Sequence, residues 1–497
     1  MRGRIGAVLL VLGALAFSTE AQAQKAQPGI DLASRANLFR PLSFQADSAA
    51  TASVFPQQSA QPVVEEKHFW LAAGEVVAVN LGVWGFNRIG DAFDITPEGD
   101  SVYWSRISPA SMLSNLQEGW VWDDNAFSNN QIAHPYHGSL YYNAARANGY
   151  SYWQSAGFAT AGSWMWEYLM ETHNPAPNDW ATTVLGGIAL GEMLYRFSSL
   201  VLNNHATGTS RFFRELGATA LSPIRGLNRG LRGQWNDVGE NPDDWRTDFI
   251  RARFDLGVRS VTDSVQIEGD DYRENFVIFG FEVDYGDPHD VPIDRPFDFF
   301  ELRGALVSNE VKPVTSLFVT GLLTRWDLRN TDRSDLRLGI LHDYTYINSK
   351  FFESGNQAFG AGLLWRRHTG QRSELRARLN VSVIALGAIS SEYAEVVGRS
   401  YDYGPGAGWG LQASWEHRNR EIVKLEYDSW FIHTVNGAQG GEHIASIVTL
   451  RGVLPIFRGF GLGAEVGVVQ RNSYYKDLED TNQRTEFGKL FVSFMTK

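Results

Sequence analysis

The chain contains no cysteine in its 497 residues, so disulfides do not hold it together. Its stability must therefore come from apolar burial or from a closed network of backbone hydrogen bonds. Positive charge is also scarce, because 44 Lys and Arg stand against 56 Asp and Glu, which gives a net charge of −12. This balance argues against a nucleic-acid partner.

Long apolar runs are missing as well after the first residues. A helix that spans a membrane needs about 20 consecutive apolar residues. The best candidate, residues 69–86, is interrupted by Glu75 and Asn80. A helical inner-membrane protein is therefore not expected.

The N-terminus has the pattern of an export signal. Arg2 and Arg4 precede a short apolar stretch over residues 5–17, and a small-x-small sequence follows at residues 21–23. This order predicts a signal peptide over residues 1–23, whose removal leaves the mature chain outside the cytoplasm.

Three segments of different composition follow. Residues 24–66 are rich in Ala, Gln, Ser and Pro and bury little, which predicts a flexible linker. Residues 67–204 combine Gly and Ala with many aromatics, which predicts a domain of closely packed helices. Residues 205–250 are rich in Arg and Gly and are expected to be a connector. The expected helices cover residues 69–90, two parts of 139–171 with a break near Gly149, and 179–201.

From residue 251 onward the apolar residues recur at every second position. In residues 374–385, for example, Leu379 and Val381 alternate with Arg378 and Asn380. This period is typical of strands with one apolar and one polar face. The segments that show it are 253–261, 275–285, 299–307, 316–326, 337–348, 358–366, 374–385, 409–416, 422–431, 444–454, 459–469 and 487–494.

The predicted fold class is α+β, with an N-terminal helical domain packed through small residues and an antiparallel transmembrane β-barrel of about 12 strands over residues 251–497. Closure of the sheet pairs every backbone donor and acceptor that lipid would leave unsatisfied. The 16 Trp and 49 Gly suit interface aromatics and tight turns. A soluble β-sandwich or a second periplasmic domain is the alternative, but the strands are as long as a tilted membrane crossing.

A barrel of this kind predicts a place in the cell outer membrane. Outer-membrane lipid and the barrel-assembly machinery are then the expected partners. Residues 489–497 resemble the closing strand of bacterial outer-membrane barrels, although the last aromatic residue, Phe494, is not terminal. No cofactor is expected.

Residues 119–196 hold the densest collection of chemically capable side chains. The most informative ones, in order, are Trp122, Asp124, Phe127, Asn130, Gln131, His134, Pro135, Gly138, Tyr141, Ala145, Arg146, Gly149, Trp166, Glu167, Glu171, Pro177, Asn178, Asp179, Gly186, Gly187, Gly191 and Glu192. In this order they resemble an uncharacterised bacterial family, the domain of unknown function numbered 3943. The resemblance implies an envelope protein in which this domain is joined to a barrel, and it implies no particular reaction.

Two histidines in this stretch are candidates for chemistry. His134 and His137 are three positions apart, which would place them on one face of a helix. As metal ligands they would need a third group, which Asp124, Glu167 or Glu192 could supply. The pattern His-x-x-His is weak, so hydrogen-bonded structural histidines are preferred and no metal is expected.

An acyl-hydrolase hypothesis uses the same region. Ser139 would be the nucleophile, His134 or His137 the base, and Glu167 the group that orients the base. The base is required because a serine hydroxyl is a poor nucleophile until its proton is taken. Ser139 also fits a turn or cap at the start of a helix, which is the simpler interpretation.

Charged residues inside this apolar stretch predict ion pairs. Glu192 and Arg196 have helical i, i+4 spacing, and Arg146 could reach Glu167. Charges in apolar surroundings are costly unless paired, so a buried polar network is preferred. Its predicted members are Asp124, Asn130, Gln131, Arg146, Glu171, Asn178, Asp179, Glu192 and Arg196.

The sequence thus favours a non-enzymatic outer-membrane barrel, plugged or capped by its helical domain, that handles envelope lipids or solutes. Arg376 and Arg378, together with Glu374, would face the lumen and hold such a plug by polar contacts. The alternative function is a membrane-lipid hydrolase that uses His134 or His137 with Glu167.

Overall fold

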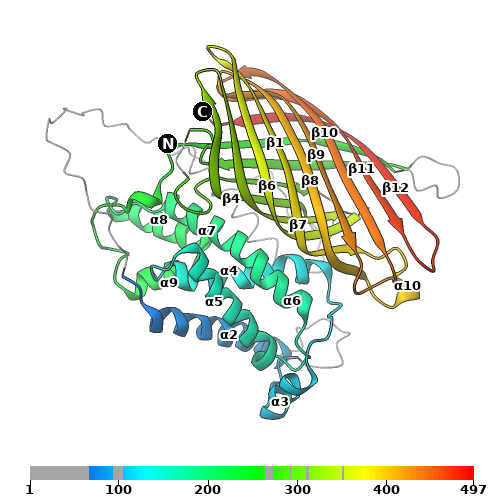
Figure 1. The fold of residues 1–497 in the computed structure, drawn as a ribbon. Helices are drawn as coiled ribbons and strands as arrows, with labels where there is room; N and C mark the ends of the chain where they lie inside the picture. The colour runs from blue at the N-terminus through cyan, green and yellow to red at the C-terminus, as the bar shows by residue number, and fades with distance from the viewer. Residues whose placement is uncertain are drawn as a thin grey trace, which may run out of the picture.

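In a computed structural model the chain forms a helical domain followed by a closed β-barrel (Figure 1). The structure describes residues 66–92, 104–263, 272–290, 293–308, 313–349 and 352–496. The predicted signal peptide lies outside the described residues, and so does the predicted linker except for its last residue. The predicted fold class, α+β with a transmembrane-type barrel of twelve strands, is confirmed.

The helical domain is built from short helices separated by glycine turns and π-helical turns. Gly149, with φ of 81°, ends the first of the two helices expected within residues 139–171. The helices are α2 (Phe69–Ala92), α3 (Pro109–Glu118), α4 (His134–Arg146), α5 (Tyr152–Met165), α6 (Pro177–Ala181), α7 (Gly187–Val201), α8 (Gly208–Leu221) and α9 (Pro223–Leu231), and the π-helical segments are η3 (Asn129–Ala133), η4 (Trp166–Met170) and η5 (Thr182–Gly186).

Helices α4 and α7 cross at the centre of the domain through two glycines. A Cβ atom at Gly138 would lie 1.8 Å from the carbonyl oxygen of Thr183, and one at Gly187 would lie 2.6 Å from Cα of Gly138. Any side chain at either position would push the helices apart. The small residues predicted to pack the domain therefore set its central crossing.

The segment expected to be a connector, residues 205–250, contains helices α8 and α9. Three of their four arginines, Arg211, Arg225 and Arg229, are buried. Glu215 in α8 lies 2.8 Å from Arg211 Nε and 2.8 Å from Arg229 Nη2 of α9. Pairing of these charges allows two arginine-rich helices to pack against α7, which the charge pattern alone did not reveal.

Twelve antiparallel strands close into a barrel in sequence order, and β1 pairs with both β2 and β12. Phe494 stands opposite Phe254 of β1 and helps to close the ring. The strands are β1 (Ile250–Asp263), β2 (Tyr272–Tyr285), β3 (Phe300–Val307), β4 (Val314–Thr331), β5 (Ser334–Ser349), β6 (Phe352–Gly370), β7 (Ser373–Ser390), β8 (Tyr401–His417), β9 (Arg420–His433), β10 (Glu442–Phe457), β11 (Phe460–Tyr474) and β12 (Thr481–Met495). A short helix, α10 (Ala394–Val397), lies between β7 and β8.

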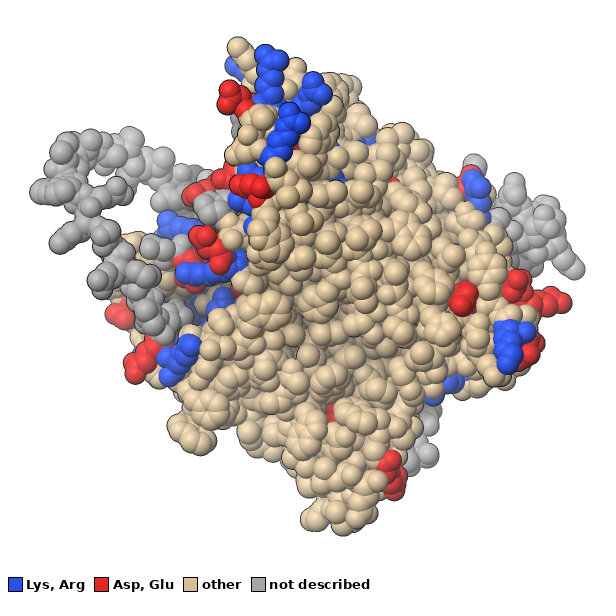
Figure 2. Space-filling model, viewed as in Figure 1, with Lys and Arg blue, Asp and Glu red and all other residues tan. Residues whose placement is uncertain are grey.

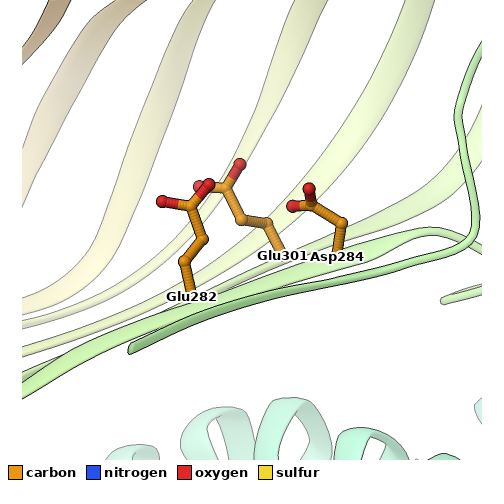
Figure 3. A group of neighbouring side chains, drawn as sticks. All are labelled: Glu282, Asp284 and Glu301. Carbon is orange, nitrogen blue, oxygen red and sulfur yellow. The ribbon is translucent and has the colours of Figure 1, made fainter. Parts of the chain in front are cut away.

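Side chains alternate between the lumen and the outside along each strand. On β7, Arg376 and Arg378 take part in ion pairs within the lumen, whereas Val381 and Val383 point outward and are exposed. Glu282, Asp284 and Glu301 on β2 and β3 likewise point into the lumen, away from the helices on the other side of the strands (Figure 3).

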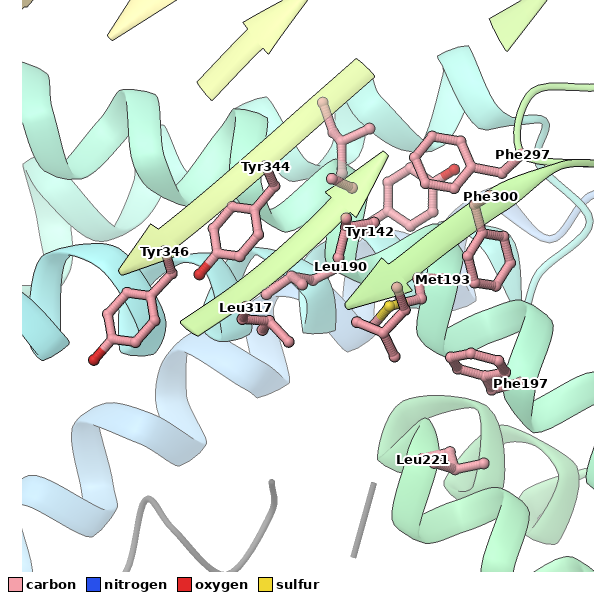
Figure 4. Packing of buried hydrophobic residues seen from close by; sticks show 14 of the residues in the cluster. Tyr142, Leu190, Met193, Phe197, Leu221, Phe297, Phe300, Leu317, Tyr344 and Tyr346 are labelled. Atoms are coloured by element: carbon pink, nitrogen blue, oxygen red, sulfur yellow. The ribbon is translucent and has the colours of Figure 1, made fainter. Parts of the chain in front are cut away.

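The helical domain packs against the outside of the barrel wall. Its α7 residues Leu190, Met193 and Phe197 belong to the same buried cluster as Phe300 and Tyr344, which point outward from β3 and β5 (Figure 4). The predicted plug or cap of the lumen is therefore wrong. The physical reason is that the outward face of β2 to β8 is aromatic where the helices cover it, and the lumen is already filled by its own charged side chains.

Candidate functional site

The wall beneath the helical domain carries polar outward-facing residues that lipid could not satisfy. Asn130 Nδ2 donates to Tyr403 Oη at 2.9 Å, and Tyr152 Oη lies 2.8 Å from His342 Nδ1. Tyr344 donates its hydroxyl hydrogen to the carbonyl oxygen of Gln131, from π-helical segment η3. These bonds make the domain a permanent part of the wall, because separation would leave buried polar groups unpaired.

A second polar group lies inside the domain and is called here the acid–histidine cluster: His134, His137, Glu167, Glu171 and Asp179. His134 Nε2 is 3.7 Å from Asp179 Oδ2, and His134 Nδ1 is 3.1 Å from Thr183 Oγ1. Glu167 Oε2 accepts a hydrogen bond of 2.9 Å from the backbone N–H of Ala176.

π-Helical segments carry one member of this cluster and lie near the others in the sequence. Glu167 belongs to η4, Thr183 to η5, and η3 ends immediately before His134. π-Helical turns are rare and are often found at functional sites, because they redirect a side chain at some energetic cost. Three such turns around one cluster mark this region as the candidate site of the domain.

The acidic members of the cluster lie away from solvent. Glu167 is fully buried and Asp179 is buried to within a few per cent. Carboxylates in such surroundings are costly as free charges, so their hydrogen-bond and histidine partners stabilise them.

The residues of the hydrolase hypothesis do not form a nucleophile–base pair in this arrangement. Ser139 Oγ donates to the carbonyl oxygen of Tyr136 at 2.6 Å, inside its own helix. His137 Nε2 instead lies 2.7 Å from Tyr141 Oη, which donates to Asn80 Oδ1 at 2.8 Å. The geometry gives Ser139 a structural position and gives the hydrolase hypothesis no support.

Glu192 is the centre of a separate ionic network in α7. Its carboxylate lies 2.7 Å from Arg146 Nε and 2.8 Å from Arg196 Nε, and it accepts a hydrogen bond of 2.7 Å from Tyr142. The expected reach of Arg146 to Glu167 is therefore replaced by a pair with Glu192. Arg196 Nη1 continues the network to Asp298, 2.7 Å away in the loop between β2 and β3.

The remaining predicted network residues lie near the wall or the acid–histidine cluster. The carboxylate of Asp124 accepts a hydrogen bond of 3.1 Å from the backbone N–H of Ser400, next to β8. Asn178 donates to Asp179 Oδ1 at 2.8 Å and accepts from the backbone N–H of Asp123 at 3.0 Å. Asp123 was not singled out from the sequence, although its place beside Asp124 offered a signal.

Ion pairs cross the barrel lumen. Arg303 Nη1 on β3 lies 2.6 Å from Glu426 Oε1 on β9, six strands away around the ring in either direction. Arg251 Nη1 lies 2.8 Å from Glu416 Oε1. The cavities next to this layer are small, with volumes of about 80 and 60 Å³, and Arg378 lines both. Paired side chains thus occupy the lumen at this level.

A lumen triad, Glu282, Asp284 and Glu301, brings carboxylate oxygens within 4.8 Å of one another (Figure 3). Each carboxylate already has a cation beside it. Lys424 Nζ lies 2.9 Å from Glu282, and similar contacts of 2.7 Å join Arg251 to Asp284 and Arg303 to Glu301. These side chains supply the positive charge that a metal would otherwise bring, so we assign the triad to the ionic layer.

Comparison with known proteins bears on the helical domain first. Residues 119–224 match the family described as Domain of unknown function (DUF3943). The predicted family resemblance is thus confirmed. The DUF3943 region contains the acid–histidine cluster and the Glu192 network, and its α4 and α7 form the central crossing of the domain. Curated proteins give no match to this chain.

Solved structures similar to the chain are outer-membrane porins and channels. The NanC porin is 11% identical, with 48% of this chain and 98% of that chain covered and a TM-score of 0.25. The DcaP channel of Acinetobacter baumannii is 8% identical, with 50% of this chain and 96% of that chain covered and a TM-score of 0.24. The toluene transporter TodX of Pseudomonas putida is 9% identical, with 50% of this chain and 90% of that chain covered and a TM-score of 0.22. Scores this low say nothing about what the chain binds or transports, so its function is inferred from its own strand register and residues.

Proposed function

We propose that this chain is an outer-membrane β-barrel that handles membrane lipid at the outer side of its wall. The observation that carries the proposal is the position of the DUF3943 region, which packs on the outward face of the barrel. Its acid–histidine cluster lies in that lateral domain, and the lumen is crossed by ion pairs. Paired side chains thus occupy the lumen, and we assign lipid handling to the lateral domain.

The outer-membrane location is supported by the surface of the wall that the domain leaves uncovered. Val383 on β7 and Leu490 on β12 are 70% and 71% exposed, as lipid-facing residues should be. Both chain ends of the barrel lie at the edge that carries four two-residue turns, such as the one at Arg418 and Asn419, together with the longer connection 286–299 between β2 and β3. Short turns at the periplasmic edge are usual for such barrels.

Outer-membrane lipid is then the first partner, and the barrel-assembly machinery is the partner that inserts the chain. The closing pair between Phe254 and Phe494 supplies an aromatic residue near the end of the last strand. The hydrolase alternative is not proposed, because Ser139 is bonded within its own helix.

A conductance experiment tests whether paired side chains close the lumen. Wild-type protein and the double variant Arg303→Ala, Arg378→Ala are inserted at matched amounts into planar bilayers. We expect no steady ohmic steps from the wild type and measurable steps from the variant, whose lumen has lost two cross-braces. Steady steps from the wild type would overturn the assignment of function to the outer side of the wall.

Lipid retention tests the second part of the proposal, which assigns lipid handling to the helical domain. Protein extracted in mild detergent is analysed by native mass spectrometry as the wild type and as Gly138→Val, which separates α4 from α7. Heat-modifiable migration confirms that the barrel is folded in both. We expect bound phospholipid or lipopolysaccharide on the wild type and much less on the variant. Equal retention by both proteins, or none by the wild type, contradicts the proposal.

A further inference from the structure

Helix α2 buries Glu75 and Asn80 beside Val76 and Val79, and its exposed residues are apolar or glycine. Glu75 and Asn80 face the domain, where Glu75 accepts a hydrogen bond of 2.8 Å from Asn148 and Asn80 accepts one of 2.8 Å from Tyr141. The opposite face carries Trp70, which is 85% exposed, and Leu81. A helix on the surface of a soluble domain has the reverse arrangement. Glu75 and Asn80 interrupt the apolar run in the sequence. Because both face inward, they do not interrupt the apolar outer face of the helix.

The neighbouring helix α5 has the same character. Residues 152–165 contain no charged side chain, and Trp153 and Trp164 near the two ends of the helix are exposed. Tryptophan is enriched where a membrane's hydrocarbon meets its head groups. Together α2 and α5 form an apolar outer face, called here the α2/α5 face, with exposed residues Phe69, Trp70, Val77, Leu81, Phe86, Ile89, Trp153 and Trp164.

The length of α2 suits a bilayer. Its 24 residues extend for about 36 Å at about 1.5 Å per residue, against a hydrocarbon thickness of about 30 Å. Among the described residues two helical stretches are long and apolar enough to span a membrane, Phe69–Ile89 and Pro177–Val201. The second is 83% buried and serves as the core of the domain, whereas only 28% of the first is buried. Phe69–Ile89 is therefore the stretch whose exposed apolar surface needs a partner.

A surface with few charged side chains continues from the barrel onto the helical domain. In Figure 2 the tan surface runs from the barrel wall down over the helices almost without interruption, and charged side chains collect at its margins. Exposed apolar patches on soluble proteins are usually a few hundred Å² at most. The wall is the surface proposed above to meet lipid, and continuity with it indicates the same occupant for the helices.

We propose that the α2/α5 face is buried in the hydrocarbon of the same bilayer as the barrel, so that α2 and the DUF3943 region together form an intramembrane helical domain. This inference rests on the outer-membrane location proposed above. Acyl chains are the partner because they need no hydrogen bonds and accept an aliphatic and aromatic surface of any shape. The polar groups of α2 point inward because only the domain can satisfy them.

The chain has no cysteine, so single-cysteine labelling has no background. Leu81→Cys and Phe86→Cys report on the α2/α5 face, Val383→Cys on the uncovered barrel wall, and Gln371→Cys on an exposed turn between β6 and β7. Each is labelled with an environment-sensitive fluorophore and reconstituted into phosphatidylcholine vesicles. Quenching is measured with nitroxide lipids labelled in mid-chain and with aqueous iodide.

The labels at residues 81 and 86 should behave like the label at residue 383. We expect quenching by the nitroxide lipid to exceed quenching by iodide several-fold at these three positions, and the reverse at residue 371. Iodide quenching at 81 and 86 equal to that at 371 would overturn the inference. Protection from both quenchers would also overturn it, because a second copy or another protein would then cover the face.

The label on the barrel wall separates this inference from the proposed location. If lipid quenches the label at 383 but not those at 81 and 86, the barrel spans the bilayer and only the intramembrane placement of the helices fails. If lipid quenches none of the three, the membrane location itself fails. Heat-modifiable migration of each variant confirms folding before the fluorescence is compared.

Discussion

Arg303 and Glu426 face each other across the barrel, with Nη1 of the arginine 2.6 Å from Oε1 of the glutamate. Their strands, β3 and β9, are diametrically opposite in the ring. A pair in this position braces two walls that backbone hydrogen bonds do not connect directly. Lys424 Nζ, 3.0 Å from the same glutamate, extends the brace along the lumen.

Breaking this brace should destabilise the barrel. Arg303→Ala removes the cation that Glu426 and Glu301 share, and the cost lies between the ~1 kcal/mol of an exposed pair and the ~3–5 kcal/mol of a fully buried one. Urea unfolding in detergent would measure it for Arg303→Ala, Glu426→Ala and the double variant. A double-mutant cycle with no coupling energy would contradict the brace.

The α4–α7 crossing should not tolerate a side chain. Gly138→Ala places a methyl group 1.8 Å from the carbonyl oxygen of Thr183, so the helices must separate, at a cost of about 1–3 kcal/mol or more. Limited proteolysis should then cut the helical domain while the barrel keeps its heat-modifiable migration. Gly157→Ala in α5 is the matched control, because nothing lies within 4 Å of the added methyl group. An unchanged digestion pattern for Gly138→Ala would show that the crossing is looser than described.

Glu192 should be among the least replaceable carboxylates of the helical domain. Glu192→Gln removes the charge that Arg146 and Arg196 share, and two buried cations lose their common partner. A loss of about 3–5 kcal/mol is expected from breaking a buried pair. The control is Glu486→Gln, whose exposed pair with Arg484 should contribute about 0–1 kcal/mol. Chemical unfolding followed by tryptophan emission compares the two, and equal losses would contradict the central role of Glu192.

Much of the fold could be predicted from local pattern. Alternation in segments such as 374–385 placed all twelve strands, because a strand with one wet and one apolar face repeats every two residues. Gly149 marked a helix end for the same local reason, since its φ of 81° favours glycine. Composition did not place two helices in the segment 205–250, because the partner of the buried Arg229 is Glu215 and only folding brings them together.

The candidate site was predictable in composition but not in arrangement. His134, Glu167 and Asp179 were recognised as chemically capable, yet their spacing gave no sign that π-helical turns would gather them. Ser139 had the right neighbours in sequence for catalysis, and its helix then bonded the hydroxyl to Tyr136. A serine that lies close to a histidine in the sequence can still donate its hydroxyl hydrogen to a backbone carbonyl of its own helix. Its place in the sequence is therefore weak evidence for a catalytic role.

The sequence by itself determined that the protein has a small-residue helical domain and a twelve-stranded barrel, because helical and strand periods are local properties of the chain. Only the tertiary structure decided that the domain lies outside the wall and that ion pairs such as Arg303 with Glu426 occupy the lumen. The physical reason is that the position of the domain and the ion pairs in the lumen both depend on which face of a strand packs against other parts of the chain. Alternation defines the two faces, but the choice between them depends on contacts between residues far apart in the chain.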